Sequence, residues 1–256
     1  MKVIGGQPLQ GPVRELRSAV CLAAHLGDEA YYAGGAITDL VERGARITVV
    51  VIAPRLAHLP VLGDPAPADA DRRALAARSA AVLGVSRIEV LDMAEPPLSV
   101  ADRVSLQGRI SEILREERPD LVLSHGPGQT IQAFDRRSAA ALANAAIAAA
   151  IGSTAAPGKA PPWEPRERWF FAPPYLTLAT PARLSRLFSE DEPWDVSWVV
   201  RATSDLVMRK WKALRAYIDH PPEAPPTLFR PYLERERFIR ATHRSLLVGR
   251  AAAGVR

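Results

Sequence analysis

The chain has 256 residues, of which 48% are hydrophobic, so it can bury a sizeable core in one large domain or two small ones. Its formal net charge is +5, and its only cysteine, Cys21, lies in an apolar run, which excludes an intramolecular disulfide and predicts a small buried side chain. No apolar stretch has the length of a membrane span and no signal-peptide core follows the first residues, so we expect a cytoplasmic protein.

Short apolar runs alternate with longer helical patterns through the first part of the chain. The strand-like runs span 19–24, 46–53, 87–92 and 120–124. The helical patterns span 30–43, 70–84, 101–117 and 137–151. Near-continuous apolar strands separated by helices predict a parallel sheet that is covered on both faces. No Gly-x-Gly-x-x-Gly follows the first strand and no Gly-Lys-Ser/Thr occurs, which argues against a dinucleotide enzyme and a P-loop NTPase.

The C-terminal part, from about residue 153 to 256, is typical of an extension of the same domain rather than of a second one. Trp169-Phe170-Phe171 and the stretch from Val196 to Val200 predict two strands. A helix is expected from about Ser204 to Tyr217, and a proline-rich turn from Pro221 to Pro231 is expected to precede a terminal helix. We expect this extension to roof the crevice at the carboxyl ends of the strands.

A histidine ends the first strand-like run, and two carboxylates follow it in the stretch Ala24-His25-Leu26-Gly27-Asp28-Glu29. A strand end and the first turn of the next helix face the same crevice, so His25 and Asp28 can converge on one ion. An imidazole and a carboxylate suit zinc or another borderline divalent metal. The alternative is that Asp28 and Glu29 are only helix N-terminal carboxylates, which the helix dipole favours.

This stretch, followed by Gly34-Gly35, resembles the Ala-His-Pro-Asp-Asp-Glu and Gly-Gly motifs of the LmbE/PIG-L family of zinc-dependent N-acyl deacetylases. Two later motifs of that family are similar to Lys210-Trp211-Lys212-Ala213-Leu214-Arg215-Ala216-Tyr217 and to Glu236-Arg237-Phe238. The resemblance implies an α/β, Rossmann-like fold with a mainly parallel sheet and helices on both faces. It also implies a substrate among N-acyl amino sugars or similar small molecules.

The resemblance further implies that His25 and Asp28 bind zinc. It places Gly27 where the family has its general base, an aspartate. Glycine has no side chain and cannot move a proton. The sequence therefore predicts slow or lost hydrolysis of N-acetylglucosamine-type amides.

The family's second motif, His-Pro-Asp-His, is altered as well. It aligns with Ala133-Phe134-Asp135-Arg136, so only the aspartate is kept. Arg136 stands in place of the third zinc ligand, and a guanidinium offers no lone pair to a metal. His125, at the end of the fourth strand-like run, is a tentative replacement that could form a shifted site with His25 and Asp28; the alternative is an ordinary polar residue at a strand end.

Two classes of function follow. The first is a divergent hydrolase with zinc at His25, Asp28 and His125, in which Asp135 or Glu29 assists proton transfer. The second is a metal-free binding or regulatory pseudoenzyme, or a repurposed catalyst on an anionic small molecule. In either class Arg136 and Arg137 could hold an anionic group at the start of a helix. The alternative to a catalytic role for Asp135 is that it is only the N-terminal cap of this helix. The altered motifs predict that zinc binding is weak or absent.

The charge is unevenly distributed. Residues 201–256 hold 12 Lys and Arg against 5 Asp and Glu, whereas the other 200 residues hold 21 against 23. A basic C-terminal part favours an anionic or sugar-like small ligand, and solvated helix faces are the commoner explanation for such charges. No nucleic-acid-binding motif accompanies the charge, so we expect no nucleic-acid partner, while a homo-oligomer stays open.

Overall fold

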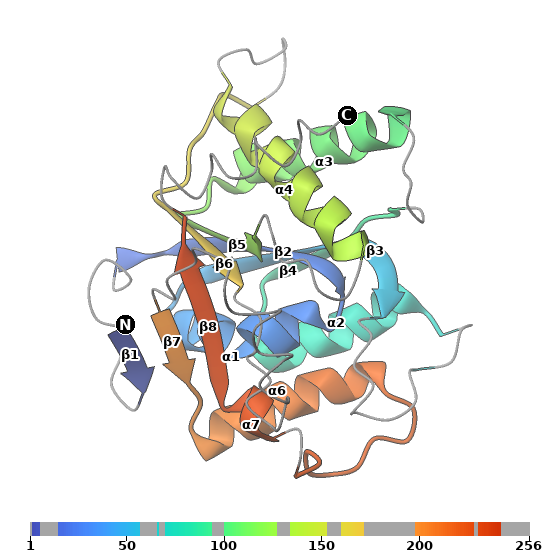
Figure 1. Ribbon diagram of the computed structural model, residues 1–256, viewed down its shortest axis with the longest axis vertical. Coiled ribbons are helices and arrows are strands. Elements are labelled where there is room, and N and C mark those ends of the chain that lie inside the picture. Colours follow the sequence, from blue (N-terminus) through green and yellow to red (C-terminus); the bar gives the residue numbers. More distant parts are fainter. Residues whose placement is uncertain are drawn as a thin grey trace, which may run out of the picture.

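One sheet runs through the part of the chain that the computed structural model describes, namely residues 2–5, 15–56, 66, 70–93, 100–126, 134–152, 160–171, 198–227 and 230–241 (Figure 1). The strand order is β1-β7-β8-β6-β5-β2-β3-β4. The strands are β1 (Lys2–Gly5), β2 (Ser18–Leu26), β3 (Arg46–Leu56), β4 (Arg87–Val90), β5 (Leu121–His125), β6 (Glu167–Phe171), β7 (Trp198–Arg201) and β8 (Arg235–Arg240). The helices are α1 (Asp28–Glu42), α2 (Arg72–Leu83), α3 (Val100–Glu117), α4 (Phe134–Ile151), α6 (Ser204–Leu214), the 3-10 helix η2 (Arg215–Tyr217) and α7 (Arg230–Leu233).

The sheet is mainly parallel, as the sequence predicts. Strand β2 pairs in parallel with β3 and β5, and the pairs β3–β4, β5–β6 and β1–β7 are parallel as well. Among the described strands, only β8 is antiparallel to its neighbours, which are β6 and β7. Strands β2 and β5 lie side by side in the middle, so their carboxyl ends meet at one edge of the sheet.

Helices cover both faces of the sheet, which confirms the predicted layering (Figure 1). Alternate residues of β2 enter two different cores: Cys21 and Ala23 pack with α1, α2 and α6, whereas Val20 and Leu22 pack with α3 and α4. Because both faces are buried, β2 reads as a continuous apolar run rather than as an alternating one. Among the described residues, no helix combines the length and the apolar character that crossing a membrane requires.

Most of the helices and strands predicted from the sequence are present, with bounds that differ by a few residues. Local sequence signals explain where helix α2 begins and ends. Helix α2 begins after Asp71, whose side chain accepts the backbone N–H groups of Arg73 and Ala74 at 2.9 and 3.2 Å. It ends at Gly84, which has a left-handed backbone with φ of 76°. The alanine-rich helix α4 packs against α3 and the sheet, as expected for small side chains.

The predicted terminal helix is wrong up to residue 241, and residues 242–256 lie outside the described part of the chain. After the short helix α7, the chain forms strand β8 instead, with Glu236 and Phe238 buried. Glu and Arg favour helices, but here pairing with β6 and β7 decides the structure. Strand β1, at the far edge of the sheet, has no counterpart in the sequence prediction.

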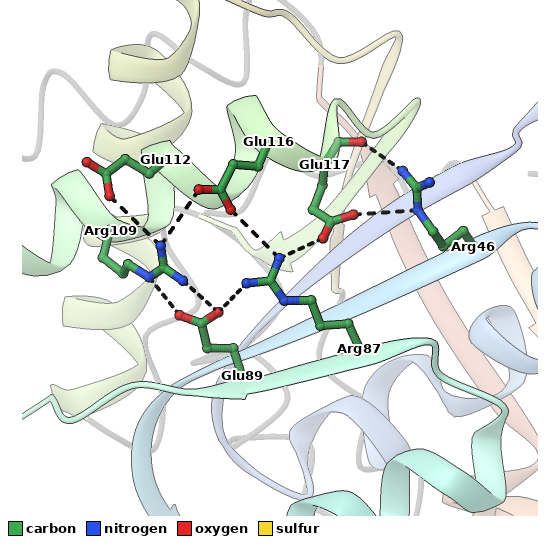
Figure 2. Close-up of polar contacts among 7 residues, drawn as sticks. All are labelled: Arg46, Arg87, Glu89, Arg109, Glu112, Glu116 and Glu117. Atoms are coloured by element: carbon green, nitrogen blue, oxygen red, sulfur yellow. Dashed lines mark hydrogen bonds and ion pairs between the residues drawn. The ribbon is translucent and has the colours of Figure 1, made fainter. Parts of the chain in front are cut away.

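An ion-pair network closes the opposite edge of the sheet, at β4 (Figure 2). The carboxylate of Glu89 in β4 accepts a hydrogen bond from Arg87 at 2.7 Å. It also accepts hydrogen bonds from Nε and Nη2 of Arg109 in α3, at 2.7 and 2.9 Å. Arg87 also donates to Glu117 at 2.8 Å. Charged side chains on an edge strand oppose pairing with another chain, and here they also tie the strand to helix α3.

Candidate functional site

The turn from β2 to α1 is held by carboxylates that fold back from the first turn of the helix. Gly27 joins the two elements with φ of 97° and ψ of −20°, a left-handed conformation that glycine adopts without steric cost. Its N–H donates to Oε2 of Glu29 at 2.9 Å. The N–H of His25 donates to Oδ2 of Asp28 at 3.0 Å. Both carboxylates are completely buried.

Asp28 joins the ends of two adjacent strands. Its Oδ2 atom lies 3.2 Å from Nε2 of His125, at the end of β5, and 3.6 Å from Nδ1 of His25, at the end of β2. The predicted residues His25, Asp28 and His125 therefore come together, and all three are buried. With Asp28 ionised, a hydrogen bond from Nε2–H of His125 places the acceptor lone pair of a neutral imidazole on Nδ1.

Aromatic rings enclose His125. Tyr32 of α1 and Phe171 of β6 meet its ring edge to face, with centroids at 5.2 and 4.9 Å, and these two aromatic rings stack at 5.5 Å. Tyr32 follows Asp28 by one helical turn, so both lie on the same side of α1. The rings fix the orientation of the imidazole beside the carboxylate.

Glu29 receives hydrogen bonds from three separate elements. Besides the Gly27 N–H, its Oε1 atom accepts the hydroxyl of Ser79 in α2 at 2.8 Å and the hydroxyl of Tyr217 in η2 at 2.7 Å. Burial raises the pKa of Glu29 above its ordinary value, although the hydrogen bonds from Tyr217 and Ser79 lower it. Burial and the nearby Glu29 charge raise the pKa of Tyr217 well above 10.0. These contacts fix the position of the Glu29 carboxylate. Its predicted part in proton transfer stays a prediction.

The Gly34-Gly35 pair and the two later motifs meet behind the site. Lys210 of α6 and Glu236 of β8 form a fully buried ion pair at 2.6 Å. The Glu236 carboxylate also accepts the backbone N–H groups of Gly35 and Ala36 at 2.5 and 2.8 Å. A Cβ atom on Gly35 would lie 3.0 Å from Oε1 of Glu236, so a larger residue here would push the carboxylate away by a few tenths of an ångström. Three stretches far apart in the sequence thus form one structural unit around α1.

The described residues do not form a metal site as they stand. Among them, no group of three or more His, Cys, Asp or Glu side chains is arranged to hold a metal ion. Oδ2 of Asp28 contacts the His125 ring and the His25 N–H. The tentative ligand set His25, Asp28 and His125 stays a prediction.

Part of the predicted site falls outside the described structure. Ala133 lies outside the described residues, and the side chains of Asp135, Arg136 and Arg137 do as well. The backbone places these three charged residues in the first turn of α4, which begins at Phe134. Asp135 is therefore inside the helix, not the residue before it, which corrects its alternative assignment as an N-terminal cap. Their roles stay predictions.

Sequence reasoning did not find the hydroxyl groups that contact Glu29 or the aromatic rings around His125. Ser79 lies 50 residues from Glu29 and Tyr217 lies 188 residues away, so no local pattern links them. The one sequence signal for the contact with Tyr217 was the resemblance of the segment from Lys210 to Tyr217 to a motif of the family. For Cys21 the prediction is confirmed: its thiol is buried, and burial raises its pKa well above 9.0.

Comparison with known proteins gives a family and a fold. The sequence profile of the PIG-L family, described as GlcNAc-PI de-N-acetylase, matches residues 20–147, which is half of the chain. No protein with a curated function matches the sequence significantly.

Several solved structures share the fold. N,N'-diacetylchitobiose deacetylase from Pyrococcus horikoshii is 21% identical, with a TM-score of 0.62 over 91% of this chain and 86% of that one. GalB, the 4-carboxy-2-hydroxymuconate hydratase from Pseudomonas putida, is 19% identical, with a TM-score of 0.62 over 88% of this chain and 96% of that one. A conserved protein from Thermus thermophilus is 20% identical, with a TM-score of 0.54 over 78% of each chain. At these identities the likeness establishes the fold alone.

Proposed function

The chain belongs to the PIG-L family, and we propose that it is a divergent member whose N-acyl deacetylase activity is weak or lost. The observation that carries this proposal is the conformation of Gly27, which stands where the family has its general base. The left-handed φ of 97° suits glycine, and the Glu29 carboxylate holds the Gly27 N–H in place. The turn has a backbone conformation that favours glycine. We therefore interpret the absence of the family's aspartate at this position as a feature of the turn itself.

The altered residues allow an estimate of how much activity is lost. Losing a positioned base typically costs roughly 10²–10⁴-fold in rate. Ala133 stands where the family has a histidine that stabilises the oxyanion, and losing one such donor costs about 10²–10³-fold. Arg136 stands where the family has its third zinc ligand, and a guanidinium cannot replace that ligand. The proposal therefore includes weak zinc binding.

We assign ligand binding to the edge where β2 and β5 end. In this proposal Asp28 orients His125, and Arg136 and Arg137 attract an anionic or sugar-like ligand from the first turn of α4. Glu29 holds the Gly27 turn in shape, and Asp135 or Glu29 assists proton transfer in any hydrolysis that is left. The C-terminal extension roofs the ligand.

The direct test is an assay of amine release from N-acetylglucosamine and from its 1-phosphate, with Asp28→Asn as the inactive reference. We expect a kcat at least about 10²-fold below the roughly 1–10³ s⁻¹ that is typical of enzymes. Calorimetry with N-acetylglucosamine 1-phosphate should detect binding that Arg136→Ala/Arg137→Ala weakens and Arg73→Ala/Arg78→Ala, on the exposed side of α2, does not. Turnover at ordinary enzymatic rates would refute the proposed loss.

A second candidate is proton-transfer catalysis on an unsaturated carboxylate. The buried contact of 3.2 Å between His125 and Asp28 supports it, because a carboxylate that orients an imidazole is a common acid–base arrangement. The hydratase from Pseudomonas putida shares the fold, so the fold accommodates such chemistry. The test is hydration of an unsaturated dicarboxylate, measured as the loss of its ultraviolet absorbance. The reaction should require His125 and should continue in the presence of a chelator. No turnover by the wild type would exclude this candidate.

A further inference from the structure

A cleft of about 470 Å³ lies between α2 and α6, and it shares no residue with the site at the ends of β2 and β5. The following residues line it: Ala81, Val82, Met208, Arg209, Trp211, Lys212, Arg215 and Glu223. The lining residues from α2, Ala81 and Val82, have shorter side chains than those from α6. The volume lies within the usual range of small-molecule sites, roughly 300–1,000 Å³.

The floor of the cleft is apolar and fixed. Trp211 lies buried beneath the cleft, and its indole N–H donates to the carbonyl oxygen of Pro222 at 3.2 Å. This hydrogen bond anchors the segment that carries Glu223 across from α6. Met208 is 44% exposed at the cleft, which leaves an apolar surface available to a ligand.

Cations stand on one side of this floor. Arg209, Lys212 and Arg215 follow one another at intervals of three residues, so they lie along one side of α6 and its continuation. Arg209 pairs with Glu42 at 2.9 Å, whereas Lys212 and Arg215 form no ion pair with any residue in the described ranges. The single carboxylate of Glu223 leaves the lining with a net charge of +2.

We propose that this cleft binds a small soluble anion that carries an apolar arm, such as an alkyl or aryl phosphate or carboxylate. Lys212 and Arg215 hold the anionic group, and the arm lies against Met208 and Val82. Apolar surface alone would not select an anion, and two cations on a flat helix face would not offer room for an arm. The combination of the two within one cleft determines the ligand class. This proposal does not depend on the proposed function.

The test is calorimetry of the full chain with hexyl phosphate as the probe. We expect saturable binding to one site, with inorganic phosphate and hexanol each binding more weakly. The variant Lys212→Ala/Arg215→Ala should weaken hexyl phosphate binding at least about tenfold. Arg73→Ala/Arg78→Ala is the matched control, because it removes two exposed cations from α2 that do not line the cleft, and it should leave the affinity unchanged.

A third variant separates the two halves of the ligand. Ala81 is exposed on α2 at the cleft, so Ala81→Phe fills the space for the arm while the cations remain. It should weaken hexyl phosphate and leave inorganic phosphate unaffected. The proposal is overturned if the wild type shows no saturable binding up to millimolar hexyl phosphate. It is also overturned if the control weakens binding as much as Lys212→Ala/Arg215→Ala does, or if Ala81→Phe has no effect.

Discussion

The hydroxyl of Tyr217 lies 2.7 Å from Oε1 of Glu29, although 188 positions separate the two residues in the sequence. Through this contact the last residue of η2 reaches the first turn of α1. The other oxygen of the same carboxylate holds the Gly27 N–H. The conformation of the turn that presents Asp28 is therefore coupled to the C-terminal part of the chain.

Tyr217→Phe should destabilise the protein by about 1.5–3 kcal/mol, because it removes a buried hydrogen bond to a carboxylate and keeps the ring. Urea denaturation measures this change. Ser79→Ala removes the other donor to the same oxygen, so the two changes should not be additive. Additive effects would mean that the two hydrogen bonds act independently. A stability of Tyr217→Phe within a few tenths of a kcal/mol of the wild type would mean that the Tyr217 hydrogen bond contributes little.

Gly27→Ala should cost roughly 1–2 kcal/mol, because a Cβ atom is strained in the left-handed region. Gly108→Ala is the matched control: Gly108 is exposed in α3, and an added Cβ atom would meet nothing within 4 Å. The control should gain about 0.5–1 kcal/mol. Equal effects of the two changes on the unfolding free energy would contradict the conformational argument.

Restoring the family's motifs should create zinc binding at a cost in stability. Gly27→Asp carries the strain of a left-handed side chain, although aspartate tolerates this region better than most residues. Combined with Ala133→His and Arg136→His, it should raise the zinc affinity of the protein, which a competition titration measures. If the triple variant binds zinc no better than the wild type, the alignment of these positions with the family is wrong.

Lys210→Met should destabilise the protein by about 3–5 kcal/mol, because it leaves the Glu236 carboxylate buried without its cation. Glu236→Gln in the same background should recover part of the loss, since the buried charge is then gone. Lys212→Met on the exposed side of the same helix is the control, with an expected change within about 0.5 kcal/mol. Thermal unfolding compares the three; similar values for both methionine variants would show that the ion pair is unimportant.

The central parallel sheet could be predicted because β2, β3 and β5 are short, nearly continuous apolar runs between helical patterns, which is typical of a sheet that is covered on both faces. Strand β8 could not, because Arg235 to Arg240 is rich in helix-favouring residues and its conformation depends on pairing with β6 and β7. Strand β1 is four residues long, too short for a periodic pattern to identify it.

For the candidate site, His25 and His125 could be placed from the sequence because both end buried strands that proved to be neighbours. The approach of Ser79 and Tyr217 to Glu29 could not, because it depends on how α2 and η2 pack against α1. The Gly34-Gly35 pair could be recognised by resemblance alone. Its physical reason, the close approach of Lys210 and Glu236, requires the folded structure.

The edge network in Figure 2 predicts a specific loss of stability in acid. Burial acts to raise the pKa of Glu89, but the hydrogen bonds and charges of Arg109 and Arg87 outweigh it and lower the pKa below 4.5. Because the folded value lies below the unfolded one, the stabilisation is present above pH 4.5 and is lost as the pH falls through the folded pKa. Glu89→Gln should therefore flatten the acid limb of stability against pH. An unchanged limb would contradict this assignment.

The central claim is that the altered motifs have removed zinc-dependent chemistry from a PIG-L protein. Metal analysis of the protein, purified without chelator and then dialysed, tests it most directly. The account predicts zinc well below one ion per chain, because Arg136 offers no lone pair and Asp28 is engaged by His125. Stoichiometric zinc that survives dialysis, and that His125→Ala releases, would contradict the account and identify His125 as the missing ligand.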